Sequence, residues 1–336
     1  MQPTIKDVAK TANVSISTIS RYLSGKHVRE WERIDEAIKL HNFVPRGYAR
    51  SLRFGRSNII GVIVPDLTNP YFASLMVGIE EITRGVGLEM MWVDTSESSV
   101  LERDALYAML GYIDGLIITP VCETDLIPML AKESGVKVVL VDRLVNEADQ
   151  FDWVVVDNRL GARLAARHLI DMGHEYLGII NGPVNSTPGR ERLEGFLEEC
   201  REAGIVVEDS YRIDGGFREK GGFNAMGKIL TSEKRPSAVF ICNNLMTIGS
   251  IRRIKQELLS IPEDISIIGF DDFALSDLLS PPITVIDRPA EMQGKLAAQI
   301  LVNTLKKKNV SSDERIQITL PSRLIVRESV KKLKDS

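Results

Sequence analysis

The stretch that decides the fold at the start of the chain is residues 4–23, TIKDVAKTANVSISTISRYL, which has the pattern of two short helices and a tight turn. Thr4 is a good N-terminal cap for the first helix, with Asp7 three residues later as its capping-box partner. Asn13 tolerates the left-handed backbone angles of a tight turn. Ser15 then caps the second helix. The pattern therefore predicts a helix, a turn and a second helix.

The second helix has two different faces. Ile19, Tyr22 and Leu23 recur at i, i+3 and i+4, which predicts an inner, apolar face. The opposite face is formed by Ile16, Ser17, Ser20 and Arg21. Short polar side chains with one arginine suit the major groove of DNA, which admits one helix and presents base edges. A small helical hairpin packed on a larger body has the same pattern, so the residues alone leave both interpretations open.

The motifs of this stretch resemble a known family. Val8-Ala9, Val14-Ser15 and residues 18–23 (TISRYL) are similar to the headpiece of the lactose-repressor (LacI/GalR) family of bacterial transcriptional regulators. The resemblance implies a three-helix, helix-turn-helix headpiece over residues 1–45 that binds double-stranded operator DNA. The headpiece contacts that it implies are Thr4, Ser15, Ile16, Ser17, Thr18, Ser20 and Arg21. The loop before the third helix is about two residues shorter than is usual in the family, by the same comparison of patterns.

Residues 46–57 follow as a basic segment. Residues 49–52 (ARSL) resemble the end of the family's hinge helix, which pairs across a dimer axis and inserts a leucine into the minor groove. The implied DNA contacts are Tyr48, Arg50 and Leu52. The alternative is a plain basic linker, and Gly47 favours it because glycine weakens a helix by roughly 1 kcal/mol. A hinge helix here is expected to fold only on DNA.

The charge is distributed unevenly along the chain. Residues 1–57 hold 11 basic and 5 acidic residues, a net charge of +6, whereas the remainder holds 31 and 41, a net charge of −10. A basic arm on an acidic body indicates a polyanionic partner for the arm only. This distribution fits a tethered DNA-binding domain better than a protein that binds nucleic acid along its whole length.

From residue 58 onward, apolar runs of strand length alternate with amphipathic stretches of helix length. The runs lie at 59–64, 88–93, 115–118, 136–141, 153–156, 177–180, 238–242, 266–270 and 284–286. The amphipathic stretches lie at 71–83, 159–171, 190–203, 222–230, 246–259 and 291–305. Buried strands that alternate with helices form parallel sheets covered on both faces. This number of strands suits two doubly wound sheets.

The body is similar to the periplasmic-binding-protein fold of the same family, with two lobes around a cleft. The expected fold is therefore α/β, a helix-turn-helix headpiece followed by a two-lobed body of doubly wound parallel sheets at 58–336. The N-lobe is expected at about 58–157 and 287–318, and the C-lobe at about 158–286 and 319–330. The chain would cross between the lobes near 157, 280–289 and 320.

The composition of the 336 residues, 44% hydrophobic and 26% charged, is that of an ordinary globular protein. Nothing in the sequence resembles a signal peptide or a membrane-spanning run, which predicts a cytoplasmic protein without a membrane partner. Cys122, Cys200 and Cys242 are widely spaced and have no metal-ligand pattern. They indicate reduced thiols, with no metal and no cofactor.

Polar side chains follow the predicted strands of the body, which is where open parallel sheets bind ligands. Carboxylates, amides, arginine and nearby aromatic faces suit a small polar effector such as a sugar, a sugar acid or a purine-like base. An Asp after a strand is also a common helix cap, so one alone would not indicate a site. Arg192 is expected to be a structural ion-pair partner. Together with the family resemblance, these strand ends predict effector contacts at Tyr71, Phe72, Thr119, Asp142, Arg190, Phe217, Asn243 and Asp271.

Sequence signatures of catalysis are absent. There is no Gly-x-Ser-x-Gly, no phosphate-binding loop with Lys and no His-Glu-x-x-His, and the chain has only four histidines. The resemblance implies a ligand-controlled repressor, not an enzyme. The alternatives are a solute-binding receptor, which would need a signal peptide, and a sugar-modifying enzyme on the same scaffold. A homodimer is expected, because the chain after Ser329 lacks the leucine heptads of tetrameric members. Induction and co-repression by the effector both remain open.

Overall fold

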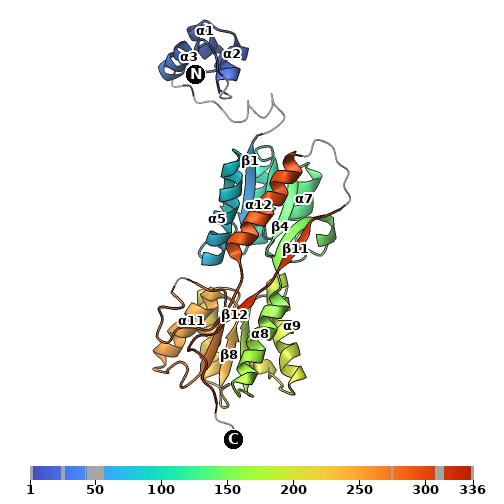
Figure 1. Ribbon diagram of the computed structural model, residues 1–336, viewed down its shortest axis with the longest axis vertical. Helices are drawn as coiled ribbons and strands as arrows, with labels where there is room; N and C mark the ends of the chain where they lie inside the picture. The colour runs from blue at the N-terminus through green and yellow to red at the C-terminus, as the bar shows by residue number, and fades with distance from the viewer. Residues whose placement is uncertain are drawn as a thin grey trace. The chain divides into compact units, whose positions relative to one another are not determined.

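The computed structural model describes residues 3–23, 27–41, 43, 57–273, 275–306 and 314–333. The chain forms two compact units, Met1–Ser57 and Asn58–Ser336. In the first unit, helices α1 (Ile5–Ala12), α2 (Ile16–Leu23) and α3 (Trp31–Leu40) pack against one another (Figure 1). Val8, Ile19 and Ile34 are fully buried at their centre. A core of this size is enough to orient three short helices but leaves the remaining side chains at the surface.

The local signals of the first unit form as the sequence indicates. The Asp7 carboxylate accepts hydrogen bonds from the N–H and the hydroxyl of Thr4, both at 2.7 Å. Asn13 ends α1 with a left-handed backbone, at φ +50°. The Ser15 hydroxyl oxygen accepts the N–H of Thr18 at 3.1 Å and so caps α2. These contacts fix where α1 ends and α2 begins.

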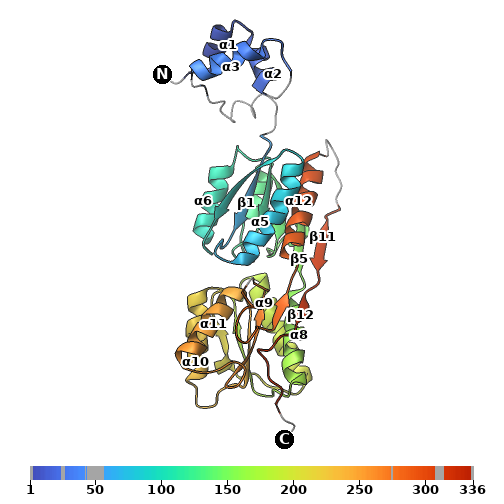
Figure 2. The ribbon, with the colours of Figure 1, turned by 60° about the vertical axis from the view of Figure 1, so that its left-hand side comes forward.

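The N-lobe of the second unit is built on a six-stranded parallel sheet of order β11-β5-β4-β3-β1-β2. Helices α5 (Pro70–Gly85) and α12 (Ala290–Lys306) cover one face, and α6 (Ser99–Met109) and α7 (Ile127–Glu133) cover the other (Figures 1 and 2). Because both faces are covered, the strands at the centre of the sheet are apolar along their whole length. The six strands are β1 (Ile59–Val64), β2 (Glu89–Asp94), β3 (Gly115–Ile118), β4 (Lys137–Val141), β5 (Asp152–Val156) and β11 (Gln317–Leu320).

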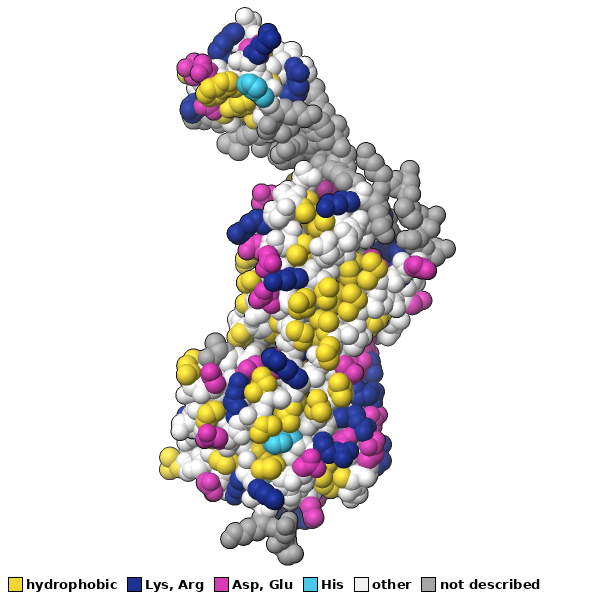
Figure 3. Space-filling view, viewed as in Figure 1, with side chains coloured by type: hydrophobic (Ala, Val, Ile, Leu, Met, Phe, Trp, Pro, Cys, Tyr) yellow, Lys and Arg dark blue, Asp and Glu magenta, His cyan; other side chains and the backbone are white. Residues whose placement is uncertain are grey.

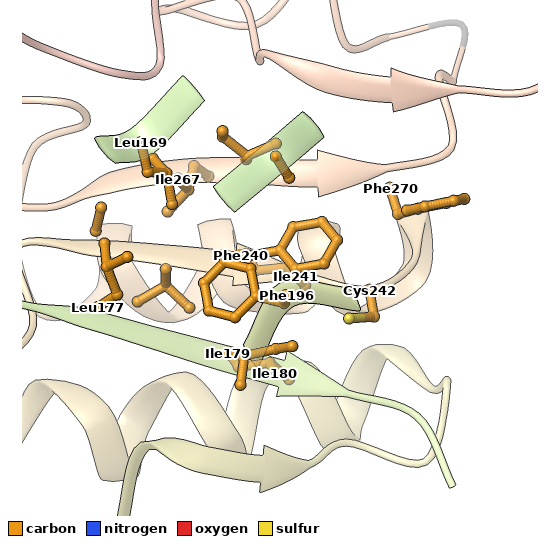
Figure 4. Packing of buried hydrophobic residues seen from close by; sticks show 14 of the residues in the cluster. Leu169, Leu177, Ile179, Ile180, Phe196, Phe240, Ile241, Cys242, Ile267 and Phe270 are labelled. Carbon is orange, nitrogen blue, oxygen red and sulfur yellow. The ribbon is translucent and has the colours of Figure 1, made fainter. Parts of the chain in front are cut away.

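The C-lobe has the same plan, on a sheet of order β12-β10-β9-β8-β6-β7 in which only β12 runs antiparallel to its neighbour. Helices α8 (Asn158–Asp171) and α9 (Thr187–Glu202) cover one face, and α10 (Glu219–Leu230) and α11 (Asn244–Gln256) cover the other (Figure 2). In the core, the rings of Phe196 and Phe240 stack with centroids 5.3 Å apart (Figure 4). The strands are β6 (Leu177–Asn181), β7 (Arg212–Asp214), β8 (Ala238–Ile241), β9 (Ser266–Phe270), β10 (Val285–Asp287) and β12 (Arg323–Ile325).

The chain passes between the lobes after β5, after β10 and after β11. β10 belongs to the C-lobe sheet through Asp287, and β11 belongs to the N-lobe sheet through Leu320. The second and third crossings therefore lie where the sequence indicated, and the boundaries between the lobes shift by one or two residues from the expected 286 and 318. Each lobe is made of two segments that are far apart in the sequence.

The predicted fold class is confirmed, because both lobes are α/β with doubly wound, largely parallel sheets, and they follow a three-helix headpiece along the chain. Two helices, α6 and α7, and three short strands, β7, β11 and β12, were not predicted from the sequence. Two short 3₁₀ turns, Ala148–Gln150 and Asp209–Tyr211, complete the body. In the described parts of the chain, no helix has the length and apolar character that crossing a bilayer requires.

Candidate functional site

A narrow pocket with about 20 Å³ of free space lies between the two lobes, and its walls are formed mainly by residues that follow the strands of both sheets. This is far below the roughly 300–1,000 Å³ that is usual for small-molecule sites, so the pocket's own side chains fill most of the cleft in this arrangement. The walls are strongly charged, with four carboxylates and three guanidinium groups. The lining residues are Asp66, Asn69, Phe72, Glu97, Asp142, Arg143, Pro188, Arg192, Phe217, Asn243, Asp271 and Arg288.

Arg288 joins the two lobes at the centre of this pocket. Its Nη1 donates to Asp142 Oδ1 of the N-lobe, and its Nε donates to Asp271 Oδ1 of the C-lobe at 2.5 Å. The Tyr71 ring covers the guanidinium, which lies 3.4 Å from the ring centroid. Burial alone would raise the pKa of Asp142, but the guanidinium of Arg288 lowers it overall. Asp142 and Arg288 therefore face one another as a charged pair at neutral pH.

Asp142 and Asp271 occupy equivalent positions in the two lobes. Each directly follows a strand and donates its N–H to the neighbouring strand, Asp142 to the Val154 carbonyl at 3.1 Å and Asp271 to the Ile286 carbonyl at 2.8 Å. Both have left-handed backbones, at φ +67° and +71°, as does Phe217 at +57°. Such angles are uncommon outside glycine and cluster at functional sites, where the surrounding structure maintains them. The backbone geometry thus supports a functional role for these three residues.

Arg192 at the start of α9 also lines the pocket and is fully buried. Its Nε donates to Asn158 Oδ1 at 2.9 Å and its Nη1 to the Cys242 carbonyl at 2.5 Å. Its Nη2 has no hydrogen-bond partner among the described residues. Burial and the charge of Arg288 lower the pKa of Arg192 to about 10, so it stays charged at neutral pH. A buried donor without a partner is costly unless a ligand supplies the acceptor.

Arg190 lies outside the pocket, contrary to the prediction from the sequence. Its side chain is 39% exposed and forms an ion pair with Glu123 of the N-lobe at 2.7 Å. Residues two positions apart on an α-helix point about 200° apart, so Arg190 and Arg192 face opposite sides of α9. Arg192, which was expected to be a structural ion-pair partner, lines the pocket instead. The sequence carried the necessary signal, because Arg192 is one turn from the fully buried Phe196.

The other predicted effector contacts divide into two groups. Phe72, Phe217 and Asn243 line the pocket together with the two aspartates. Asn243 caps α11 by accepting the Met246 N–H at 2.8 Å and donates its amide to the Phe217 carbonyl at 2.8 Å, so it orients Phe217. Tyr71 covers Arg288 and is not one of the lining residues, and Thr119 is fully buried at the end of β3 without lining the pocket. Tyr71 therefore contacts the site through Arg288.

Seven of the twelve lining residues were not among the predicted effector contacts: Asp66, Asn69, Glu97, Arg143, Pro188, Arg192 and Arg288. Arg288 directly follows β10, so the strand-end rule that found Asp142 and Asp271 would also have found it. Arg143 forms a bidentate pair with Glu97, at 2.7 and 2.8 Å. Among the described residues there is no group of three or more His, Cys, Asp or Glu side chains that could hold a metal ion.

The headpiece offers a second candidate surface, on helix α2. Ser17 and Arg21 are exposed there, and the surface of the headpiece carries several Lys and Arg side chains (Figure 3). The Ser15 hydroxyl bonds to those of Ser17 and Thr18, at 2.7 and 2.8 Å. Ile16, expected on the outer face, is half-buried against the headpiece core, because an apolar side chain gains from packing there. The predicted contacts Tyr48, Arg50 and Leu52 lie outside the described residues.

Comparison with known proteins identifies the family. Residues 4–46 match the family described as bacterial regulatory proteins, lacI family, and residues 166–330 match the periplasmic binding protein-like domain. The chain is 34% identical to the HTH-type transcriptional repressor PurR of Photobacterium profundum, over 98% of this chain and 99% of that protein. The chain belongs to the LacI family. It is also 33% identical to the ribose operon repressor of Escherichia coli (strain K12), over 94% and 97% of the two chains.

Solved structures agree with this membership. A LacI family transcriptional regulator from Enterococcus faecium, solved with bound ribose, matches with a TM-score of 0.72 and 28% identity. The match covers 82% of this chain and 100% of that one. This LacI-family chain is therefore a DNA-binding transcriptional regulator and not an enzyme. The solute-receptor and sugar-modifying alternatives are not favoured, because its relatives over nearly the whole length are repressors.

Proposed function

We propose that this regulator is a repressor whose operator affinity is switched by a neutral monosaccharide bound between the lobes. The observation that carries the proposal is the balance of charge in the pocket, where four carboxylates face three guanidinium groups. A wall without net positive charge disfavours an anionic effector such as a sugar acid. Carboxylates accept from hydroxyl groups and arginines donate to them, so a polyol satisfies both kinds of group.

The geometry supports the same class of effector. Arg192 Nη2 is a buried donor without an acceptor among the described residues, and a sugar hydroxyl or ring oxygen would supply one. Phe72 and Phe217 offer apolar ring surface, which suits the C–H face of a sugar ring. One relative is named a ribose operon repressor and one solved neighbour contains ribose, so pentoses are the first candidates.

Calorimetric titration of the full-length protein tests this proposal. D-ribose, other pentoses and hexoses are compared with gluconate, as the sugar acid, and with guanine, as the purine. We expect at least one neutral sugar to bind the wild type and to bind Asp271→Ala much more weakly, because that carboxylate lines the pocket. Binding of gluconate or guanine alone, with no neutral sugar bound, would show that the effector class is wrong.

For the DNA-binding surface, we propose that α2 enters the major groove and that Ser17 and Arg21 contact base edges. Both are exposed on the same helix of a basic unit. Thr4, Ser15, Thr18 and Ser20 would lie at the margins of the contact and reach the phosphate backbone. Tyr48, Arg50 and Leu52 are proposed as minor-groove contacts of a hinge helix that folds on the operator.

We propose that the protein acts as a homodimer in the cytoplasm, where it meets operator DNA. The edge strand β2 and the neighbouring helix α6 carry large apolar side chains that are exposed in the isolated chain, which is typical of an interface. They are Met91, Trp92, Val100, Leu101 and Tyr107. In such a dimer, a change in the angle between the lobes alters the spacing of the two hinge segments. Effector binding and operator binding are then linked, and each changes the affinity of the other by the same factor.

A further inference from the structure

We propose that Arg288 is a built-in cation that holds the lobes closed when no effector is bound. In two-lobed sites a ligand that contacts both lobes favours closure. Here a side chain of the protein already makes that contact, since Arg288 pairs with Asp142 of the N-lobe and with Asp271 of the C-lobe. The inference rests on the proposed function only in regarding this pocket as the effector site.

The charges of the pocket explain why closure needs such a cation. The side chains of Asp142 and Asp271 are each only 3% exposed, and the lobes bring them to the same guanidinium. Two carboxylates that approach one another out of water repel strongly unless a positive charge lies between them. Arg288 supplies that charge with a planar group that forms bonds on two sides, including a second bond from Nη2 to Asp271 Oδ2 at 3.3 Å. The closed arrangement is therefore stable only while the cation is in place.

The position of Arg288 in the chain suits this role. It directly follows β10, in the short crossing between Asp287 of the C-lobe sheet and helix α12 of the N-lobe. Stacking against Tyr71 of α5 fixes the guanidinium from the N-lobe side, at 3.4 Å from the ring centroid. A side chain that starts at the crossing reaches both aspartates without belonging to the interior of either lobe.

Besides Arg288, the described residues make hydrogen bonds across the cleft, the partly exposed Arg190–Glu123 ion pair, and a buried contact in which the Arg143 guanidinium lies over the Phe217 ring. Two of the hydrogen bonds come from backbone N–H donors of the N-lobe, at Glu123 and Leu144, which bond to the Asn185 carbonyl at 2.9 Å and to the Thr187 hydroxyl at 3.0 Å. Individually such bonds contribute little, and the Arg190–Glu123 pair is too exposed to contribute much more. These weak contacts form once the lobes are closed and contribute little to closing them. For that reason these two N–H groups are direct reporters of the closed state.

This arrangement has a consequence for regulation. An effector that binds Asp142 and Asp271 must share them with Arg288 or displace it, so it competes with a contact that already exists. The change in lobe angle on effector binding then reflects the difference between the arrangement held by Arg288 and the arrangement held by the effector. It does not reflect the closing of an open cleft. We expect removal of the cation to make the lobe angle more dependent on effector than it is in the wild type.

Hydrogen exchange of the full-length protein, without effector or DNA, tests the inference. The reporters are the N–H groups of Glu123 and Leu144. The controls are two N–H groups inside the sheets, Thr119 in the N-lobe and Cys242 in the C-lobe, which bond at 3.0 and 2.9 Å. In Arg288→Gln we expect protection at the two reporters to fall by about tenfold or more while the controls keep theirs.

The matched charge control is Arg167→Gln, which removes an arginine that is 58% exposed on α8 and should leave all four N–H groups unchanged. Arg288→Lys keeps the positive charge but not the planar fork, so it should lose less reporter protection than Arg288→Gln. If Arg288→Gln lowers protection at all four N–H groups, the result for Arg288→Lys decides. Partial loss of protection at the two reporters alone supports the inference. Wild-type reporters without protection, or reporters unchanged in both Arg288 variants, would overturn it. None of these results depends on which effector binds.

Discussion

Replacing Glu102 by glutamine should stabilise the protein, and more so at higher pH. Glu102 lies on α6 and is fully buried, with Oε2 accepting the Val121 N–H at 3.4 Å. Apart from each other, Glu102 Oε1 and Asp125 Oδ2 have no hydrogen-bond partner among the described residues. Burial and the hydrogen bond to Asp125 raise the pKa of Glu102 to about 10. The Glu102 carboxyl is therefore protonated in the folded protein at neutral pH.

The magnitude follows from the difference between the folded and unfolded states. In the unfolded chain this carboxyl has the ordinary pKa of 4.5, so folding at pH 7 must take up a proton. The stability associated with Glu102 is fully present below pH 4.5 and is lost as the pH rises toward 10. At pH 7 the loss amounts to about 3 kcal/mol, and at pH 5.5 to about 1 kcal/mol. Glutamine has no proton to gain and can still donate a hydrogen bond to Asp125. Glu102→Gln should therefore recover most of this lost stability.

Urea unfolding of the wild type and Glu102→Gln at pH 5.5 and pH 7 measures the effect. The variant should gain about 2 kcal/mol more over the wild type at pH 7 than at pH 5.5. Asp104→Asn is the matched control, because it removes an exposed carboxyl from the same helix and should give no pH-dependent gain. An equal gain at both pH values would refute the reasoning, because it would show that packing and not protonation determines the difference.

Three further predictions concern the two binding surfaces. Arg21→Ala should lose roughly 1–3 kcal/mol of discrimination at one base pair in binding assays with operator variants, and a uniform loss on all DNA would assign Arg21 to phosphate contact instead. Leu52→Ala should weaken operator binding and reduce the bend angle while non-specific binding stays nearly unchanged; an unaltered bend would make residues 46–57 a simple linker. Arg192→Lys and Asp271→Ala should abolish effector binding in calorimetry, whereas Arg190→Ala should still bind the effector with an affinity that changes only modestly. Equal losses in Arg190→Ala and Arg192→Lys would contradict the placement of the two arginines.

The elements that could be predicted from the sequence are those whose pattern is determined by burial. Strands such as β1 and β9 are covered on both faces, so they form continuous apolar runs. The strands that were missed lie at sheet edges: β7 and β12 have three residues each, and β11 has the sequence Gln-Ile-Thr-Leu. A strand of that length at an edge is defined by its pairing partner and carries little pattern of its own.

The site was predictable to the extent that it depends on strand ends. Asp142, Asn243 and Asp271 follow strands and line the pocket, as the position of ligand sites in open sheets predicts. The choice between Arg190 and Arg192 depended on which face of α9 is buried, and the motif alone does not show that face. Arg288 was overlooked because residues 280–289 were interpreted as a crossing between the lobes, although Arg288 also follows a strand.

The two-segment construction of each lobe has a consequence for biosynthesis. Helix α12 and strand β11 emerge from the ribosome after nearly the whole C-lobe, yet they complete the N-lobe. Until then the N-lobe sheet has one face without α12, and apolar residues of β3 and β4 that α12 covers, such as Ile117 and Val139, lie open to solvent. The nascent N-lobe is thus an aggregation-prone intermediate for most of translation. A ribosome that stalls between β10 and α12 would release a chain with a nearly finished C-lobe and an N-lobe that has no means of closing its core.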